Sequence, residues 1–401
     1  MIGAIALIAA AAFAIWLLHP RVMKRDFWRA LSTPLASIIG SGFLVSVPIL
    51  RDLYGGWAAA AMMVLLAAAY LVGAAVRENI RYVEPLMENH HADLPVASLE
   101  RLSQLVLAFA YFVSVAYYLV LFGTFLLKPF GIADPVPVKL LVTALLAAIG
   151  GVGLWRGFRA IEGLEIYAVS FKLAVIGGVI AGLIAHAVIQ SVNGPQPPIP
   201  PGRFETGSLP ILLGLFILVQ GFETSRFLGD SYDTPTRIRS MKAAQIIAAA
   251  VYLAFFLAMT PILGNAANGH GVAAIIDMLT PVSALLPLLV LAGALASQSS
   301  AAIADTLGAG GLVHDFARTR IKLVHTYPLV ALVAAFVVWE TNVYTLIAFA
   351  SRCFAAYYAL QCLVATLSAI RRKSLWKAAG FAALAALCAV IVVIGAPAEG
   401  E

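Results

Sequence analysis

Twelve long apolar runs dominate this chain of 401 residues, and they restrict its fold more than any other feature. A helix needs about 20 apolar residues to cross a membrane, and most of these runs approach that length. Hydrophobic residues make up 62% of the chain and charged residues 11%, whereas soluble domains are about 45–50% apolar and about 25% charged. We therefore expect an all-α polytopic membrane protein with one transmembrane helix for each run. The runs are 2–18, 33–50, 55–76, 102–127, 138–154, 164–189, 208–228, 243–264, 283–306, 325–340, 343–370 and 376–396.

Lysine and arginine are distributed unequally between the two sides that these runs define. If residue 1 lies outside, the inner loops hold 19 of the 26 basic residues and the outer loops hold four. Inner loops of membrane proteins carry such an excess. The first run has no basic segment before it, and four basic residues follow in 19–32, so we interpret it as an uncleaved anchor and not as a signal peptide. We expect a multi-pass protein of a cell inner membrane or plasma membrane, with its N-terminus outside.

A proline-rich segment, NGPQPPIPPGRFETG at 193–207, cannot be helical and lies on the expected outer side. If the first and the last runs are set aside, five runs of similar hydropathy precede it and five follow it, with an offset of roughly 178 residues. Because five is odd, the two halves must have opposite orientations in the membrane, an inverted repeat that many secondary transporters share. The predicted parts are an extra N-terminal transmembrane helix with a basic inner loop (1–29), the first repeat (30–192), the outer loop (193–207), the second repeat (208–370) and a C-terminal transmembrane helix (371–401).

The second run contains Gly40-Ser41-Gly42 near its middle. Non-helical backbone persists at membrane depth only when it is buried in protein or lines a wet cavity. A helix that restarts after the tripeptide would present its first amides and its positive dipole end to a carboxylate or another anion. The alternative is a patch of small residues for close helix packing. We predict one half of a substrate site here, formed by Ile39, Gly40, Ser41, Gly42 and Phe43.

The seventh run, 208–228, has a matching interruption between two glycines. In inverted-repeat transporters, substrates bind between the repeats at interrupted helices in matching positions. We therefore expect the second half of the site in this run, where backbone carbonyls would bind an amino group and two phenylalanines would cover it. The predicted residues are Phe216, Ile217, Val219, Gln220 and Phe222.

Both interruptions resemble those of the amino acid–polyamine–organocation (APC) superfamily. The stretch IIGSGFLVSVP looks like its first core helix, with Gly-Ser-Gly as the unwound substrate loop, and GFETSRFLGDSYDTPTRIRSMKAAQ (221–245) is similar to its sixth. The likeness covers about residues 30–370. It implies the LeuT-type five-plus-five fold with alternating access, and transport of an amino acid or a related small amine. The chain departs from the pattern at Phe216-Ile217-Leu218-Val219, where members that carry amino acids usually have Phe-Ala-Phe-like residues, and in its leading extra span.

Lys172 lies deep in the apolar run 164–189. A lysine at such a depth costs about 2.5–3.5 kcal/mol on insertion scales, so a functional role is expected. In sodium-independent members of the family, a lysine at such a place takes the position of a bound cation. By this resemblance its ammonium would reach carbonyls of residues 37–39, with Ser299 and Ser300 as hydroxyl neighbours, and it could release and regain a coupling proton. The alternative is a snorkelling lysine with its head in the inner interface.

Other polar residues of the runs suggest a gate and a second kind of cargo. Glu223, Arg226 and Asp230 have the spacing i, i+3 and i+7, so we predict that they neutralise one another as a gate-like ion pair. Contact with the substrate and a capping role are the alternatives. Gln298 and Asp305 share a helix face and, together with Gln220, would be the ligands of an inorganic-ion transporter or channel on the same scaffold.

Patterns for other functions do not occur in the chain. It contains no GxxxxGK[ST] phosphate loop, which argues against ATP as the energy source. His90, His91 and Asp93 lack the spacing of helical metal ligands, and we interpret them as a solvated loop. We expect no enzyme activity, no catalytic residues, no metal site, no cofactor and no nucleic-acid partner. The expected partners are a small-molecule substrate, a coupling proton and the lipid bilayer.

Overall fold

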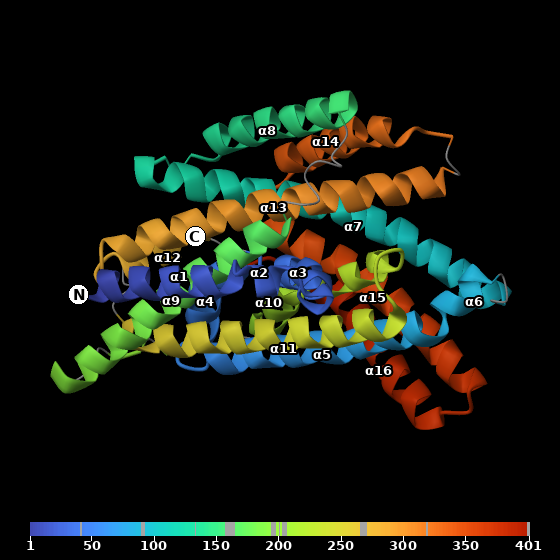
Figure 1. Cartoon of the computed structure of the whole chain (residues 1–401), viewed down its shortest axis with the longest axis horizontal. Coiled ribbons are helices and arrows are strands. Elements are labelled where there is room, and N and C mark those ends of the chain that lie inside the picture. Colours follow the sequence, from blue (N-terminus) through green and yellow to red (C-terminus); the bar gives the residue numbers. More distant parts are fainter. Residues whose placement is uncertain are drawn as a thin grey trace.

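The computed structural model describes residues 1–40, 42–89, 93–132, 134–156, 165–193, 198–199, 201–202, 207–264, 271–317 and 320–398. Within these ranges the chain is built of helices, and extended pairing is limited to an isolated bridge between Gly55 and Pro201 (Figure 1). Ser41, His90, His91 and most of the proline-rich segment 193–207 lie outside the described residues.

The helices of the first half of the chain are α1 (Ile2–Leu17), α2 (Pro20–Met23), α3 (Asp26–Ile38), α4 (Gly42–Tyr54), α5 (Ala58–Tyr82), α6 (Glu84–Glu88), α7 (Leu94–Leu127), the 3₁₀ turn η1 (Lys128–Phe130), α8 (Pro135–Arg156) and α9 (Glu165–Asn193). Those of the second half are α10 (Ser208–Gly214), the 3₁₀ segments η3 (Phe216–Val219) and η4 (Phe222–Leu228), α11 (Thr234–Met259), η5 (Thr260–Ile262), α12 (Ala274–Leu279), α13 (Leu285–Phe316), α14 (Leu323–Glu340), α15 (Val343–Arg371) and α16 (Leu375–Ile394).

Ten helices in the described part of the chain are long and apolar enough to cross a membrane, if α3 with α4 is counted as one span. The prediction of an all-helical polytopic membrane protein is therefore confirmed, with ten such spans in place of about twelve. The run 2–18 forms α1, whose 16 residues reach about 24 Å, less than the roughly 30 Å of a hydrocarbon core. The run 208–228 forms three short helical segments instead of one helix.

The interrupted second span lies at the centre of the molecule. In the most apolar 18 residues of this span, 94% of the residues are buried inside the protein. The corresponding share is 28% in α8 and 28% in α16. The helices α5, α7, α9, α11, α13 and α15 surround the central segments, and α8, α14 and α16 lie at the periphery (Figure 1). A central segment shielded from lipid in this way can leave helical geometry, because its peptide groups can find partners in the surrounding protein.

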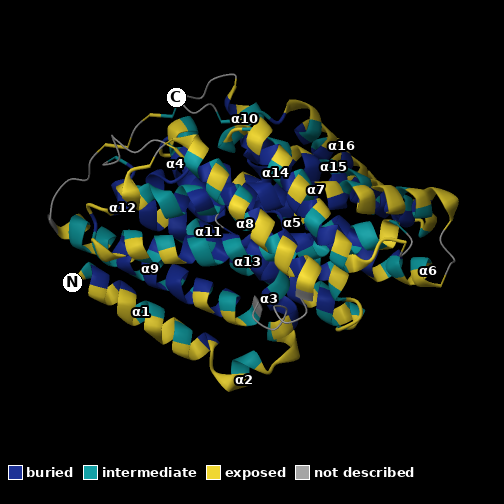
Figure 2. Ribbon diagram, turned by 90° about the horizontal axis from the view of Figure 1, so that it is seen from above, coloured by how far each residue is buried: buried dark blue, intermediate teal, exposed yellow. Residues whose placement is uncertain are grey.

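The extra helix α1 packs along α9 at one edge of the molecule, and its outer face is exposed (Figure 2). Glycines of α9 permit this close approach. A Cβ added at Gly178 would lie 2.5 Å from the carbonyl oxygen of Ala6, and one added at Gly177 would lie 2.7 Å from the ring of Phe13. Because α9 also carries Lys172, α1 supports the helix that reaches the centre of the fold.

Polar side chains fix the starts of two helices in the second half. Asp233 precedes α11 and accepts a hydrogen bond from the amide of Thr236 (3.1 Å). Hydrogen bonds from the Thr236 side chain and amide hold the pKa of the Asp233 carboxyl below its usual value. Asn342 caps α15 in the same way by accepting from the amide of Thr345 (2.8 Å). These caps satisfy amides that have no partner within the helix.

Candidate functional site

The predicted interruption of the second span is present. The helix α3 ends at Ile38, the next residue Ile39 leaves helical geometry (φ −85°, ψ 65°), and α4 begins at Gly42. The last carbonyls of α3 and the first amides of α4 therefore have no partner inside their own helices. Ser41, the central residue of the predicted substrate loop, lies outside the described residues.

The predicted interruption of the seventh span is also present. The helix α10 ends at Gly214, and after η3 the backbone is extended at Gln220 (φ −84°, ψ 179°). Gly221 then adopts a left-handed conformation with φ +113°, which side chains rarely allow, and η4 follows. The second break thus extends from residue 215 to residue 221.

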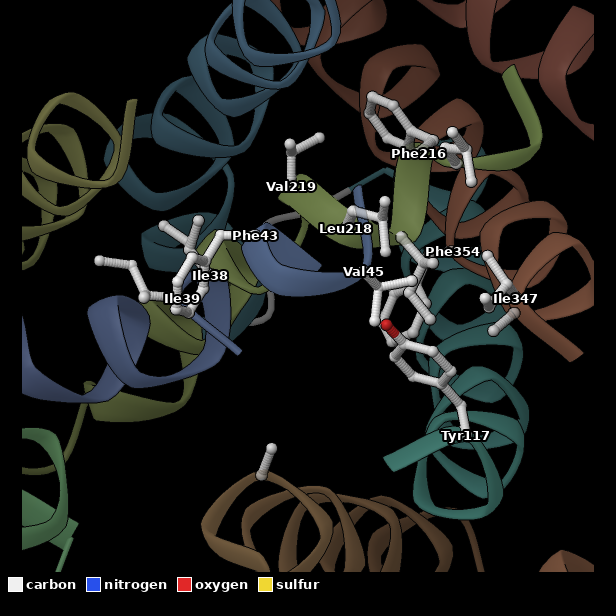
Figure 3. Close-up of a cluster of buried hydrophobic side chains, with 14 of the residues drawn as sticks. Ile38, Ile39, Phe43, Val45, Tyr117, Phe216, Leu218, Val219, Ile347 and Phe354 are labelled. Atoms are coloured by element: carbon white, nitrogen blue, oxygen red, sulfur yellow. The ribbon is translucent and has the colours of Figure 1, made fainter. Parts of the chain in front are cut away.

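The two breaks lie directly against each other. A Cβ added at Gly221 would lie 2.5 Å from the Cβ of Ser37, and one added at Gly42 would lie 2.6 Å from the carbonyl oxygen of Leu218. In Figure 3 the ribbon that carries Phe43 passes beside the ribbon that carries Leu218. Gly42 therefore permits close packing of the two segments, as the alternative interpretation of the tripeptide expected. Gly40 differs, because a Cβ there would make only an ordinary contact of 3.5 Å.

Side chains from three surrounding helices bind the carbonyls at the end of α3. Lys172 of α9 donates a hydrogen bond to the Ala36 carbonyl (2.7 Å), and Ser297 of α13 donates one to the Ile39 carbonyl (3.3 Å). The hydroxyl of Tyr252 on α11 lies 3.2 Å from the Ile38 carbonyl oxygen. The tertiary structure thus supplies partners for these three carbonyl groups.

The second break is held by two hydroxyl groups. Tyr252 also hydrogen-bonds the Leu218 carbonyl, so one hydroxyl contacts both breaks. Ser351 of α15 donates to the Gly214 carbonyl (2.7 Å) and accepts from the amide of Ile217 (2.8 Å). Each hydroxyl therefore connects a break to a continuous helix.

The environment of Lys172 differs from the prediction in its partners. Its side chain is 1% exposed and its nitrogen contacts α3, so it does not snorkel to an interface. Its nitrogen also lies 3.5 Å from the hydroxyl of Ser297. Ser299 and Ser300 instead donate to the Leu295 and Ser297 carbonyls of their own helix. Ser297 was not predicted from the sequence, because the orientation of α13 about its axis was unknown.

The predicted mutual neutralisation of Glu223, Arg226 and Asp230 is wrong. Arg226 pairs with Glu84 of α6 (2.9 Å) and Glu100 of α7 (2.7 Å). Glu223 turns back toward the break, where it accepts hydrogen bonds from the Gly221 amide and the Tyr358 hydroxyl. In the part of the chain that the structure describes, neither Glu223 nor Asp230 forms an ion pair within 4 Å. The spacing argument assumed an α-helix, whereas η4 is a 3₁₀ helix beside two acidic partners.

The ion pairs of Arg226 belong to a buried network that sequence analysis missed. Arg237 of α11 also pairs with Glu84 (2.8 Å), so two cations and two carboxylates neutralise each other. Gln361 of α15 accepts from Arg226 (2.8 Å) and donates to Glu100 (3.1 Å). The network joins α6, α7, η4, α11 and α15. The sequence signal was that acidic residues outnumber basic ones in the loop 77–101, which lies on the expected inner side.

Aromatic side chains cover the breaks. Phe222 stacks on Tyr358 with ring centroids 4.9 Å apart, and Phe216 meets the same ring edge-on at 5.9 Å. The ring of Tyr118 lies 3.5 Å from the position that a Cβ of Gly40 would take, and its hydroxyl accepts a hydrogen bond from Gln220 (3.4 Å). The predicted residues Phe43, Ile217 and Val219 are buried in the same region.

Two further polar residues of α13 are buried near this centre. The carboxylate of Asp305 is 3% exposed and accepts a hydrogen bond from Ser114 of α7. Gln298 is fully buried, and neither its oxygen nor its nitrogen has a hydrogen-bond partner among the described residues.

Asp93, which lies near His90 and His91 in the sequence, pairs with Arg371. The described residues contain no group of three His, Cys, Asp or Glu residues that could hold a metal ion.

A surface cavity of about 510 Å³ lies at the opposite end of α3 from the break. The 13 residues of α3 span about 20 Å, so the cavity and the break are one helix length apart. It lies next to the buried ion-pair network, since Arg237 follows one of its lining residues. The cavity is lined by Asp26, Arg29, Ser231, Tyr232, Asp233 and Thr236.

Comparisons with known proteins identify relatives over nearly the full chain. The profile of a family described as APC superfamily transporter matches residues 20–395. A protein of Aquifex aeolicus (strain VF5), described as an uncharacterized protein, is 37% identical over 392 residues, which are 96% of this chain and 95% of the relative. The matched region includes both breaks and all the helices that surround them.

Proposed function

The chain belongs to the APC superfamily of transporters, and we propose that it is a secondary active transporter of an amino acid or a related small amine, coupled to the proton gradient. Membership confirms the resemblance that the two interrupted runs indicated, and it makes the chain a transporter and not an enzyme. The substrate, the coupling ion and the mechanism below are our proposals.

We propose that the fold is the LeuT-type five-plus-five inverted repeat. Residues 30–192 would form the first repeat and 208–370 the second, with residues 1–29 and 371–401 as additions at the two ends and 193–207 as an outer loop. The distribution of basic residues supports an N-terminus outside a bacterial cytoplasmic membrane. The position of the two breaks supports the repeat, because each opens one of the proposed halves.

One observation carries the proposal: two interrupted segments from the two halves touch at their breaks in the buried centre. The substrate carboxylate would bind the amides of residues 40–43, where the positive dipole end of α4 favours an anion. The amino group would bind carbonyl oxygens of η3. One of them, that of Leu218, already accepts a hydrogen bond from Tyr252. A rocking motion that separates the breaks would open this site.

Lys172 would couple a proton to this motion. Its ammonium links α9 to the last turn of α3 through the Ala36 carbonyl. A charged donor forms a hydrogen bond roughly twice as strong as a neutral one. Loss of a proton from Lys172 would therefore weaken the link between α9 and α3, and a protonated Lys172 would restore it.

The buried network of Arg226, Arg237, Glu84 and Glu100 would close the inner side. It connects η4, directly after the second break, to α6, α7 and α11. In the proposed orientation these segments and the cavity beside them face the cytoplasm. The network would have to separate before the substrate could leave on that side. The gate is thus assigned to four residues, of which only Arg226 was expected.

An inorganic-ion transporter or channel on the same scaffold is the second candidate. The observation in its favour is that oxygen atoms of Gln220 and Gln298 are buried without a hydrogen-bond partner among the described residues. Together with Asp305 they would offer hard oxygen ligands to a cation.

Uptake by purified protein in liposomes tests the proposal. A labelled amino-acid mixture should accumulate only with an inward proton gradient, and labelled inorganic cations offered in parallel should not. Accumulation of a cation without uptake of any amino acid would establish the second candidate instead. Uptake that ignores the proton gradient would exclude proton coupling.

Lys172→Ala separates binding from coupling. This variant should lose proton-driven accumulation but keep exchange of labelled for unlabelled substrate, because the proposed substrate contacts remain. Lys128→Ala, which removes a surface lysine paired with Asp277, is the matched control and should accumulate substrate normally. Normal accumulation by Lys172→Ala would remove Lys172 from the coupling mechanism.

A further inference from the structure

The buried acidic residues in the described part of the chain fall into two classes. Glu78 and Glu100 each pair with at least one arginine. Glu223 and Asp305 are 0% and 3% exposed, yet no Lys, Arg or His nitrogen in the described ranges lies within 4 Å of either carboxylate. The second class therefore lacks the countercharge that buried carboxylates require.

The partners of these two carboxyl groups are neutral hydrogen-bond donors. Asp305 on α13 accepts from the Ser114 hydroxyl of α7. One oxygen of Glu223 accepts from the Gly221 amide and from the Tyr358 hydroxyl of α15, whereas the other oxygen has no hydrogen-bond partner among the described residues. A proton on that free oxygen would leave both existing hydrogen bonds intact.

The titratable groups that face the two carboxyls are also uncharged at neutral pH, apart from the carboxyls themselves. Because both side chains are buried, ionisation of both would place two negative charges without a countercharge in the protein interior. Two bases of the surrounding elements are engaged elsewhere, Lys172 of α9 with α3 and Arg226 of η4 with α6 and α7. The uncharged titratable groups are tyrosines: Tyr358 of α15 donates to Glu223 and packs against Tyr357, Tyr111 of α7 is bonded through its carbonyl to Ser114, and Tyr118 of α7 accepts from Gln220.

We propose that Asp305 and Glu223 hold protons in this conformation and form a second proton-carrying pair, separate from Lys172. Two carboxylates without a countercharge must bind a proton or a cation. A proton needs no additional volume among packed side chains, and the described residues offer no third carboxylate, histidine or cysteine to complete a metal site. Each carboxyl group connects a different pair of elements, α13 to α7 and the second break to α15, so loss of either proton would change the contact between moving parts.

Infrared spectroscopy of the full chain in lipid tests the proposal directly. Protonated carboxyl groups have a carbonyl band that ionised carboxylates lack. The wild-type protein should show this band at neutral pH and lose it as the pH is raised. Asp305→Asn and Glu223→Gln should each remove one component of the band, and the double variant should remove the whole alkali-sensitive band.

Two further variants keep the test decisive if Asp305→Asn or Glu223→Gln fails to fold. Ser114→Ala removes a donor and not the carboxyl, so it should shift the Asp305 component to higher frequency without abolishing it. Asp277→Asn changes a carboxylate that pairs with Lys128 at the surface, and it should leave the band unchanged. Absence of the band in the wild type at neutral pH, or a band that both carboxyl variants and Ser114→Ala leave unchanged, would overturn the proposal.

The transport consequence rests on the proposed function and is measured separately. In liposomes, Asp305→Asn should lower the number of protons moved with each substrate molecule. If no amino acid is transported but the infrared band behaves as expected, the proposed function fails and the protonated pair stands. If transport is proton-coupled but the band is absent, the pair fails and Lys172 remains the proposed carrier.

Discussion

Replacing Gly221 with alanine tests whether the two breaks must touch. The residue has φ +113°, and a Cβ there would lie 2.5 Å from the Cβ and 2.7 Å from the carbonyl carbon of Ser37. A side chain in such a backbone conformation costs about 1–3 kcal/mol. Forcing an extra methyl group into packed protein costs about 1–3 kcal/mol more. We therefore expect Gly221→Ala to destabilise the protein by roughly 4 kcal/mol.

Gly131 provides a matched control for the backbone contribution. It also has a positive φ (+71°), but a Cβ there would meet no atom within 4 Å. Gly131→Ala should therefore cost only the conformational part, about 1–2 kcal/mol. Thermal unfolding of both variants in the same detergent should show at least twice the loss of midpoint temperature for Gly221→Ala.

The result that would refute this reasoning is equal destabilisation by the two substitutions. It would mean that α3 and the second break can separate at no cost, and that their contact does not define the resting structure. Uptake measurements add a second criterion, because a protein whose breaks are held apart should not occlude its substrate. Gly221→Ala with native transport would contradict the proposed site.

Three shorter predictions concern other parts of the site. The stability of Gly40→Ala should remain within about 1 kcal/mol of the wild type in thermal unfolding, since its Cβ would meet the Tyr118 ring at an ordinary 3.5 Å. The variant should nevertheless abolish uptake if the substrate approaches this residue, and normal uptake would argue against that approach. Glu84→Gln should destabilise the protein by about 3 kcal/mol, because it removes one anion that Arg226 and Arg237 share. A neutral effect would exclude a tight inner gate. Ser297→Ala should destabilise the protein by about 1–3 kcal/mol because it leaves the Ile39 carbonyl without this donor, whereas Ser299→Ala should have little effect. A larger loss of stability in Ser299→Ala than in Ser297→Ala would favour the serine predicted from the sequence.

The interruptions of both spans could be predicted from sequence because their signals are local. Glycines that cluster inside an apolar run indicate where the backbone of that same run leaves helical geometry. The helix α3 does end within two residues of Gly40. The helical class and most of the spans follow from composition in the same way. The number of spans was harder to predict, since hydropathy alone does not distinguish the three short segments of 208–228 from one continuous helix.

Side-chain partners could not be predicted in the same way because they depend on packing between distant segments. Arg226 pairs with Glu84, which is 142 residues away in the sequence, although other acidic residues lie closer to Arg226 along the chain. Spacing along one helix defines which residues share a face, but not which neighbour that face meets. The choice between Ser297 and the later serines depended on the rotation of α13 relative to α3, for which the sequence contains no local signal.

Tyr252 offers a test of whether the two breaks act as one unit. Its hydroxyl is buried and contacts the carbonyl oxygens of both Ile38 and Leu218, although it has a single proton to donate. Tyr252→Phe would leave the two carbonyls without this donor, at a cost of about 1–3 kcal/mol.

If the hydroxyl couples the breaks, combining Ser297→Ala at the first break with Ser351→Ala at the second should be non-additive, since Tyr252 contacts both breaks. Coupled substitutions typically interact by about 0.5–3 kcal/mol, whereas independent sites add within about 0.5 kcal/mol. A control cycle of Ser297→Ala with Lys128→Ala, at the protein surface, should be additive. Additivity in both cycles would show that each break is stabilised on its own, so that separating one would not release the other.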